Sequence, residues 1–177
     1  MSITLITGPM FSGKTTELLR MLERSRIAKK TCLLIKWAED DRYDCTRVVT
    51  HDKRSATASL SCTALPDITE VVAYDVVGID EGQFFPGLAE FCDAVANAGS
   101  EVFVAALDGT YQREPFPAIA ALIPLAEFVK KIHAVCVSCG RLAAYSVRQE
   151  SAPAVTGTYS IGGTESYKAV CRACLPR

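Results

Sequence analysis

The chain of 177 residues has no long apolar segment and no excess of charge of either sign. No run approaches the ~18 consecutive apolar residues that a membrane-spanning helix requires. The apolar start, residues 1–7, has no basic segment before it, and the end of the chain matches no retention or lipidation signal, so we expect a cytoplasmic protein. Lys and Arg total 19 against 20 Asp and Glu, so no overall basic field attracts nucleic acid or an anionic membrane.

Internal repeats, linker-like tracts and low-complexity segments are also absent from the sequence. Its composition, 49% hydrophobic and 22% charged, is typical of a globular protein of one domain, or of one domain with a small appendage. Short apolar runs alternate with helical patterns up to residue 135. From residue 136 on, short alternating runs with glycines and no long helix indicate a β-rich appendage. We therefore expect two parts, residues 1–135 and 136–177.

The pattern of apolar residues places the elements of the first part. Continuous apolar strands separated by helices indicate an α/β fold with a parallel sheet covered on both faces. The first strand, helix and second strand would form a right-handed βαβ unit. Strands are expected at 3–7, 31–37, 75–80, 101–107 and 127–135, helices at 15–29, 66–73, 88–98 and 118–123, and a polar loop at 40–54.

Residues 8–15 match the phosphate-loop pattern Gly-x-x-x-x-Gly-Lys-[Ser/Thr] at every fixed position. The backbone N–H groups of such a loop surround a phosphate, and the helix that follows presents its positive end to the anion. Lys14 would reach the β and γ phosphates of ATP, and Thr15 would bind Mg²⁺. The alternative is a glycine turn beside a solvated lysine. The loop residues expected to bind ATP are Gly8, Pro9, Met10, Phe11, Ser12, Gly13, Lys14 and Thr15.

Two acids, Asp80 and Glu81, follow the apolar run at residues 76–79. The carboxyl end of a strand lies on the ligand side of an α/β sheet, so Asp80 suits the Walker-B role of holding Mg²⁺. Glu81 would orient water in an ATPase, or accept a proton from a substrate hydroxyl in a small-molecule kinase. Two solvated carboxylates at a strand end are the alternative.

Aromatic residues follow both strand ends, with Phe84 and Phe85 after the acids and Tyr111 and Phe116 after the run at 101–107. A flat apolar slot near a general base suits a nucleobase or another planar ring, which favours the kinase over the ATPase. Ordinary core packing would give the same spacing, so both interpretations stay open here.

Four of the eight cysteines form two Cys-x-x-Cys pairs, Cys136 with Cys139 and Cys171 with Cys174. Four thiolates match a closed, tetrahedral, structural zinc site. The long segment between the pairs is tolerated because loop-closure entropy grows slowly with length. A redox dithiol or unbound thiols are the alternatives. The scattered Cys32, Cys45, Cys62 and Cys92 are expected to be buried or incidental thiols.

Taken in order along the chain, these motifs resemble those of the type II thymidine kinases. The resemblance covers almost the whole chain, and because the chain stops three residues after Cys174, it looks most like the compact poxvirus form. The matching segments are residues 8–15, Asp-Asp-Arg-Tyr at 40–43, Thr-His-Asp-Lys at 50–53, Gly-Ile-Asp-Glu-Gly-Gln-Phe-Phe-Pro at 78–86, Ala-Ala-Leu-Asp-Gly-Thr-Tyr-Gln-Arg at 105–113, Ile-Gly-Gly at 161–163, and Tyr167.

The resemblance implies a RecA-like P-loop fold with a small zinc-ribbon or lasso domain, and a homotetramer. It implies transfer of the ATP γ-phosphate to thymidine, and more weakly to deoxyuridine, with Mg²⁺ and one structural zinc. Glu81 would be the catalytic base, Arg42 would touch the transferred phosphate, and the backbone of the lasso would read the edge of the base. The side chains around thymine would be Met10, Phe84, Leu107, Tyr111, Phe116 and Tyr167, and the lasso residues would be Thr158, Tyr159, Ser160, Ile161 and Gly162.

Two other functions compete with this one. A P-loop ATPase could use its zinc ribbon to grip nucleic acid, and a nucleotide-binding switch would have no turnover. A ribbon that binds nucleic acid should be basic with exposed aromatic residues. Residues 136–177 are only mildly basic, with Arg141, Arg148, Lys168, Arg172 and Arg177 against Glu150 and Glu165.

Overall fold

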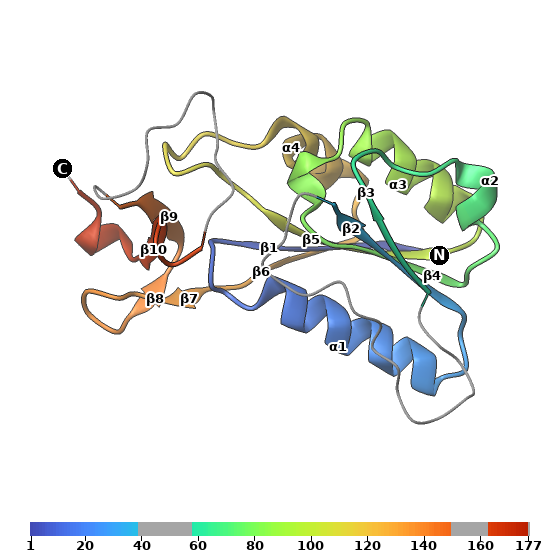
Figure 1. Ribbon diagram of the computed structural model, residues 1–177, viewed down its shortest axis with the longest axis horizontal. Helices are drawn as coiled ribbons and strands as arrows, with labels where there is room; N and C mark the ends of the chain where they lie inside the picture. Colours follow the sequence, from blue (N-terminus) through green and yellow to red (C-terminus); the bar gives the residue numbers. More distant parts are fainter. Residues whose placement is uncertain (39–57, 150–162, 177) are drawn as a thin grey trace.

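The computed structural model describes residues 1–38, 58–149 and 163–176, and its centre is a six-stranded sheet (Figure 1). The strand order is β3-β2-β4-β5-β1-β6, and every neighbouring pair is parallel. The expected α/β fold with a parallel sheet is confirmed. The strands are β1 (Ile3–Gly8), β2 (Cys32–Trp37), β3 (Ala58–Cys62), β4 (Val76–Ile79), β5 (Glu101–Leu107) and β6 (Phe128–Lys131).

Helices cover both faces of this sheet. The helix α1 (Lys14–Ile27) lies on one face, and α2 (Ile68–Val71), α3 (Leu88–Asn97) and α4 (Pro117–Leu122) lie on the other (Figure 1). Alternate residues of the strands point to opposite faces, which gives two apolar clusters. No helix in the described ranges has the length and hydropathy to cross a membrane.

The close packing of α1 depends on a glycine in the middle of β4. A Cβ at Gly78 would lie 2.8 Å from Cδ1 of Leu22 and 3.3 Å from Cδ1 of Leu18. Both leucines are buried on α1. Any side chain at Gly78 would therefore require Leu22 and Leu18 to repack between α1 and the sheet.

The C-terminal residues form a smaller unit beside the carboxyl ends of the strands (Figure 1). It consists of two antiparallel pairs, β7 (Ala134–Val135) with β8 (Leu142–Ala143), and β9 (Tyr145–Arg148) with β10 (Tyr167–Val170). Three short 3₁₀ helices complete the described elements, η1 (Gly82–Phe84), η2 (Ile123–Leu125) and η3 (Arg172–Cys174).

Two strands differ from the expectation. The run at 127–135, expected as one core strand, is divided: β6 is an exposed edge strand of the main sheet, and β7 pairs in the small unit. Edge strands accept charged residues such as Lys130 and Lys131, whereas central parallel strands do not. The strand β3 was not expected, because Ala58–Cys62 is short and Leu60 is its only large apolar residue. The expected polar loop at 40–54 lies outside the described residues.

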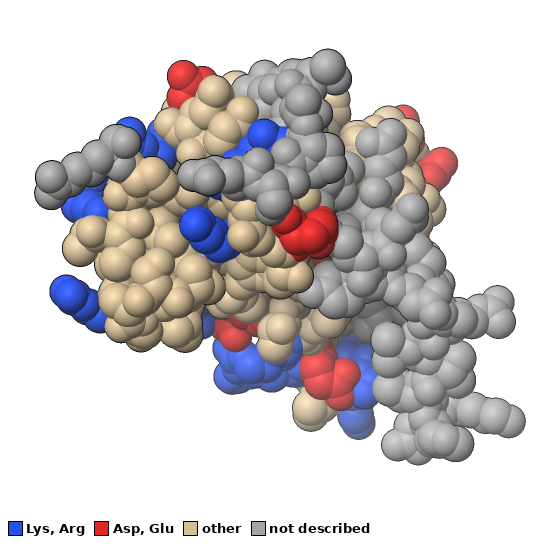
Figure 2. Space-filling model, turned by 60° about the vertical axis from the view of Figure 1, so that its left-hand side comes forward, with Lys and Arg blue, Asp and Glu red and all other residues tan. Residues whose placement is uncertain are grey.

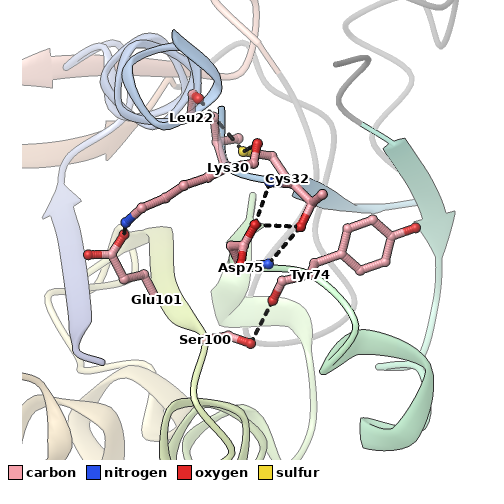
Figure 3. Close-up of polar contacts among 8 residues, drawn as sticks. Leu22, Lys30, Cys32, Tyr74, Asp75, Ser100 and Glu101 are labelled. Carbon is pink, nitrogen blue, oxygen red and sulfur yellow. Dashed lines mark hydrogen bonds and ion pairs between the residues drawn. The ribbon is translucent and has the colours of Figure 1, made fainter. Parts of the chain in front are cut away.

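At the amino ends of the strands, polar groups pair with one another (Figure 3). Asp75 Oδ2 accepts hydrogen bonds from the N–H of Thr31 at 2.7 Å and from its Oγ1 at 2.8 Å. The Lys30 Nζ lies 2.6 Å from Glu101 Oε2, and Ser100 Oγ donates to the Tyr74 carbonyl at 2.8 Å. These contacts tie together the segments that lead into β2, β4 and β5.

Candidate active site

The phosphate loop joins β1 to α1 and takes its shape from two glycines. A Cβ at Gly8 would lie 2.2 Å from the carbonyl oxygen of Ile132, so no larger residue fits there. Gly13, immediately before α1, has φ 83°, a left-handed conformation that favours glycine. The Lys14 Nζ donates to the Pro9 carbonyl at 2.9 Å, which places the ammonium group over the loop. The loop thus leads into the amino end of a helix, the arrangement that binds phosphate.

A hydrogen bond links this loop to the carboxyl end of β4. The Thr15 Oγ1 donates to Asp80 Oδ1 at 3.0 Å, and the N–H of Glu81 donates to the same oxygen at 3.1 Å. Burial, together with the charge of the neighbouring Glu81, raises the pKa of Asp80 to about 6. A hydroxyl beside a carboxylate provides the oxygen ligands that Mg²⁺ prefers.

Glu81 follows with a backbone conformation that is unusual for its residue type. Its φ of 54° and ψ of 40° lie in the left-handed region. Gln83 Nε2 donates to Glu81 Oε2 at 2.6 Å, and Gln83 Oε1 accepts the N–H of Leu107 at 3.0 Å. Non-glycine residues keep such conformations only where their surroundings hold them, and they gather at functional sites.

The aromatic residues expected near the acids make separate contacts. Phe84 lies against Trp37, with ring centroids 5.7 Å apart, and Tyr111 faces Tyr167 of β10 at 6.5 Å. Phe116 is buried and packs in the main apolar cluster. The Tyr111–Tyr167 contact joins the segment after β5 to the small unit.

The small unit also contacts the phosphate loop directly. The N–H of Met10 donates to Ser146 Oγ at 2.9 Å, and Ser146 lies on the buried side of β9. Sequence analysis singled out neither Ser146 nor Gln83. The only signals are a polar residue on the inward side of a short alternating strand and a polar residue before the apolar pair Phe84-Phe85.

The two cysteine pairs meet in the small unit. The Sγ atoms of Cys136, Cys139, Cys171 and Cys174 all lie within 4.8 Å of one another. Tetrahedral zinc with Zn–S bonds of about 2.3 Å needs sulfur atoms about 3.8 Å apart, so the cluster fits the metal after a small contraction. A backbone hydrogen bond from Cys171 lowers the pKa of Cys136 to about 6, and hydrogen bonds with Cys139 and Cys171 raise the pKa of Cys174 to about 12.

Six of the predicted site residues lie outside the described residues, namely Arg42 in the polar loop and Thr158, Tyr159, Ser160, Ile161 and Gly162 in the lasso. Of the expected thymine contacts, Met10, Phe84, Leu107, Tyr111, Phe116 and Tyr167 are described. Met10 lies in the phosphate loop, Leu107 ends β5 and Tyr167 begins β10. The Met10–Ser146 hydrogen bond and the Tyr111–Tyr167 contact join the small unit to the loop and to the segment after β5.

The parallel sheet, the loop between β1 and α1, and the Thr15–Asp80 contact place the chain among the P-loop proteins of the α/β class. Comparison with known proteins narrows this class. The sequence model of the thymidine kinase family matches residues 1–175. The chain therefore belongs to the thymidine kinase family.

Individual relatives agree with this assignment. The chain is 51% identical to the cytosolic thymidine kinase of Homo sapiens over 172 residues. These residues make up 97% of this chain and 72% of the human protein. It is 50% identical over 173 residues to the thymidine kinase of Monkeypox virus, covering 97% of this chain and 95% of the viral protein. The thymidine kinase of Rabbit fibroma virus is also 50% identical, over 174 residues. The expected family and its phosphotransferase class are confirmed, and this class implies ATP as the phosphoryl donor.

Proposed function

We propose that this protein is a thymidine kinase that transfers the γ-phosphoryl group of ATP to the 5′-hydroxyl of thymidine, giving dTMP and ADP. The family match along residues 1–175 carries the proposal. The contact between Thr15 and Asp80 supports the proposal, because it brings the phosphate loop to the carboxyl end of β4, where Glu81 lies. Deoxyuridine would be a second, poorer substrate.

Each residue of this edge has a role in the proposed reaction. The loop from Gly8 to Thr15 would bind the phosphates through its N–H groups, with Lys14 on the β and γ phosphates. Thr15 and Asp80 would hold Mg²⁺, which neutralises the charge on the phosphate oxygens when it is bound. Glu81 would accept the proton of the 5′-hydroxyl as the oxygen attacks phosphorus. Positioning and neutralisation of charge would supply most of the rate.

The nucleoside would lie between the sheet edge and the small unit. Support comes from the Tyr111–Tyr167 contact, which joins these two parts, and from Met10 and Leu107 at the same edge. The side chains proposed around the base are Met10, Phe84, Leu107, Tyr111, Phe116 and Tyr167. On the evidence of the resemblance, the lasso backbone at 158–162 would read the edge of the base, and Arg42 would contact the transferred phosphate.

The small unit would hold one structural zinc ion on Cys136, Cys139, Cys171 and Cys174. The approach of the four Sγ atoms to within 4.8 Å supports this proposal. All four sulfur ligands come from the protein, which leaves no open position for catalysis. We propose a corresponding division of labour, with ATP bound by residues 1–135 and zinc by residues 136–177.

On the evidence of the resemblance we propose a homotetramer, and exposed apolar side chains on β6 and in the small unit support association between chains. Phe128 is 61% exposed at the edge of the sheet, and Leu142 is 72% exposed on β8. Edge strands with apolar side chains favour pairing with another copy. Light scattering should report four chains, and Phe128→Asp should lower that number. A monomer at micromolar concentration would contradict this assembly.

We propose a cytoplasmic location and no nucleic-acid or membrane partner. The name of the human relative includes "cytosolic". On the face shown in Figure 2, the basic side chains of the described residues are dispersed and have acidic side chains among them. That distribution favours the kinase over an ATPase that grips nucleic acid.

A phosphoryl-transfer assay with labelled ATP tests the function. Thymidine should be the best acceptor, and deoxyuridine should lose roughly 10–200-fold in kcat/KM because only a methyl group is missing. Deoxycytidine should be poorer by ~10⁴ or more, because its 4-amino group would face a main-chain donor. ADP release that depends on DNA and not on thymidine would contradict the proposal and favour the ATPase.

The zinc proposal has its own experiment. Cys171→Ser should lose zinc, and thymidine binding should weaken more than ADP binding, because the metal stabilises the segment that it closes. Cys62→Ser is the matched control, since Cys62 lies on β3 away from the cluster. Metal analysis of the purified protein should give one zinc per chain. A zinc content far below one with full activity would contradict the structural role.

A further inference from the structure

Gln83 is a buried polar side chain that uses both ends of its amide group. It is 7% exposed and lies in η1, directly after Glu81 and Gly82. Its Nε2 lies 2.6 Å from Glu81 Oε2, and its Oε1 lies 3.0 Å from the nitrogen of Leu107. Burying an amide is costly unless it is hydrogen-bonded, so these two bonds specify one position for the side chain.

The direction of the amide follows from its partners. The main-chain N–H of Leu107 can only donate, so the amide atom that faces it must be the oxygen. The NH₂ group then faces the Glu81 carboxylate oxygen Oε2, which accepts its hydrogen bond. The assignment of nitrogen and oxygen in Gln83 is therefore determined by chemistry on both sides.

The proposed base, Glu81, must have both its main chain and its carboxylate fixed in position. Glu81 has a left-handed backbone, and its N–H donates to Asp80 Oδ1 at 3.1 Å. The bond to Asp80 fixes the main chain, whereas the bond to Gln83 fixes the carboxylate. Through its hydrogen bond with Leu107, Gln83 also links this carboxylate to the end of β5, which forms one wall of the proposed thymidine site.

We propose that Gln83 is the positioning residue of the catalytic base, which rests on the proposed role of Glu81. By joining the Glu81 carboxylate to the main chain of β5, it sets the base at a constant distance from the nucleoside that packs on Leu107. Reactions of this type depend on alignment, and a misplacement of about 1 Å costs about 10²-fold in rate. Gln83 itself exchanges no proton with the substrate.

The variant Gln83→Met removes both hydrogen bonds and keeps an unbranched side chain of similar length. We expect kcat to fall roughly 10–100-fold, while KM for ATP changes by less than about 3-fold, since the phosphate loop is untouched. In the Glu81→Gln background the same substitution should change kcat by less than about 3-fold, because the base that it positions is already gone. Measurements of ADP binding and of thermal unfolding serve as controls for the folding of each variant.

Two further variants complete the design. Asn97→Ala is the matched control, because Asn97 Nδ2 also donates to a carboxylate, that of Asp93, but on the exposed surface of α3. It should leave kcat unchanged. Gln83→Asn retains the amide but is one methylene too short for both partners, so it should also lower kcat, and it serves if Gln83→Met does not fold.

The outcomes separate this proposal from the proposed function. A fall in kcat of equal size in both backgrounds, or no fall in the wild-type background, overturns the positioning role and leaves Glu81 as the base. Full turnover in Glu81→Gln alone overturns the base assignment and this proposal with it. A large fall that disappears when Glu81 is replaced supports both.

Discussion

The strand β4 has an aspartate at each end, and the two lie in opposite environments. Asp75, before the first residue of β4, is exposed, and hydrogen bonds from the N–H and hydroxyl of Thr31 lower its pKa. Asp80, after the last residue, is buried beside Glu81, and its pKa is raised to about 6. At the amino end, hydrogen bonds from Thr31 stabilise the ionised carboxylate of Asp75. At the carboxyl end, burial and the charge of Glu81 disfavour the ionised carboxylate of Asp80.

On this difference we assign a structural role to the polar groups at the amino ends and propose a functional role for those at the carboxyl ends. The amino ends of the strands carry polar groups that pair with one another and stabilise the fold (Figure 3). The carboxyl ends carry two adjacent acids, of which one is buried and the other has a left-handed backbone. A buried acid with a raised pKa, as Asp80 has, is characteristic of sites where a bound cation or substrate compensates the buried charge.

The largest difference between the two ends should be in turnover. Glu81→Gln should lower kcat by roughly 10²–10⁴-fold, the range for loss of a general base. Binding of ATP and thymidine, measured by calorimetry, should stay nearly unchanged because the substitution is isosteric. Near-normal turnover would remove the base assignment and would leave Glu81 as a residue beside the metal.

Substitution of Asp80 by Asn should change stability in a pH-dependent way. The folded-state pKa of about 6 lies above the usual 3.8, so ionisation of Asp80 costs stability as the pH rises from about 4 through about 6. Without Mg²⁺, Asp80→Asn should therefore be more stable than the wild type at pH 7.5, by up to about 3 kcal/mol, and equal to it near pH 4. Urea unfolding across this pH range measures the difference, and a difference independent of pH would contradict the expectation.

The same substitution at the other end should have the opposite sign. Because hydrogen bonds from Thr31 lower the pKa of Asp75, its ionised form contributes stability above the usual pKa of 3.8 and loses that contribution as the pH falls further. Asp75→Asn should lower Tm at pH 7, and this difference should shrink as the pH falls below the usual pKa of 3.8, with kcat unchanged. A loss of kcat would mean that the two ends are not separate.

The smallest effect is expected for the ion pair between Lys30 and Glu101. The two side chains are 41% and 35% exposed, so water and salt screen their charges. Glu101→Gln should change the free energy of unfolding by less than ~1 kcal/mol at low salt and by less still in 1 M salt. A larger loss would show that the amino-end contacts act as one cooperative network.

Features that depend on local pattern could be predicted from the sequence. The phosphate loop, the acids after β4 and the strands β1, β2, β4 and β5 follow from apolar runs and fixed spacings, and the structure places the loop and the acids together at the carboxyl end of the sheet. The division at 127–135 could not be predicted, because Val129 and Val135 look equally apolar while their strand partners differ.

Contacts between residues that are far apart in the sequence could not be predicted either. Gln83 reaches Leu107 across 24 positions, and Met10 reaches Ser146 across 136. No periodicity or spacing relates such residues, because each pair depends on the order of the strands and on how far each strand extends. Only the folded chain shows that Gln83 lies between the proposed base and β5.

The hydrogen bond between Met10 and Ser146 limits how far this protein can be treated as separable modules. The acceptor for a main-chain N–H of the phosphate loop is on β9, which pairs with β10, and β10 ends at Val170, immediately before the first cysteine of the second pair. A shortened chain that stopped at residue 135 would keep every residue of the phosphate-loop motif and lose this acceptor. Grafting or excising the nucleotide-binding part for engineering would therefore require a substitute for Ser146.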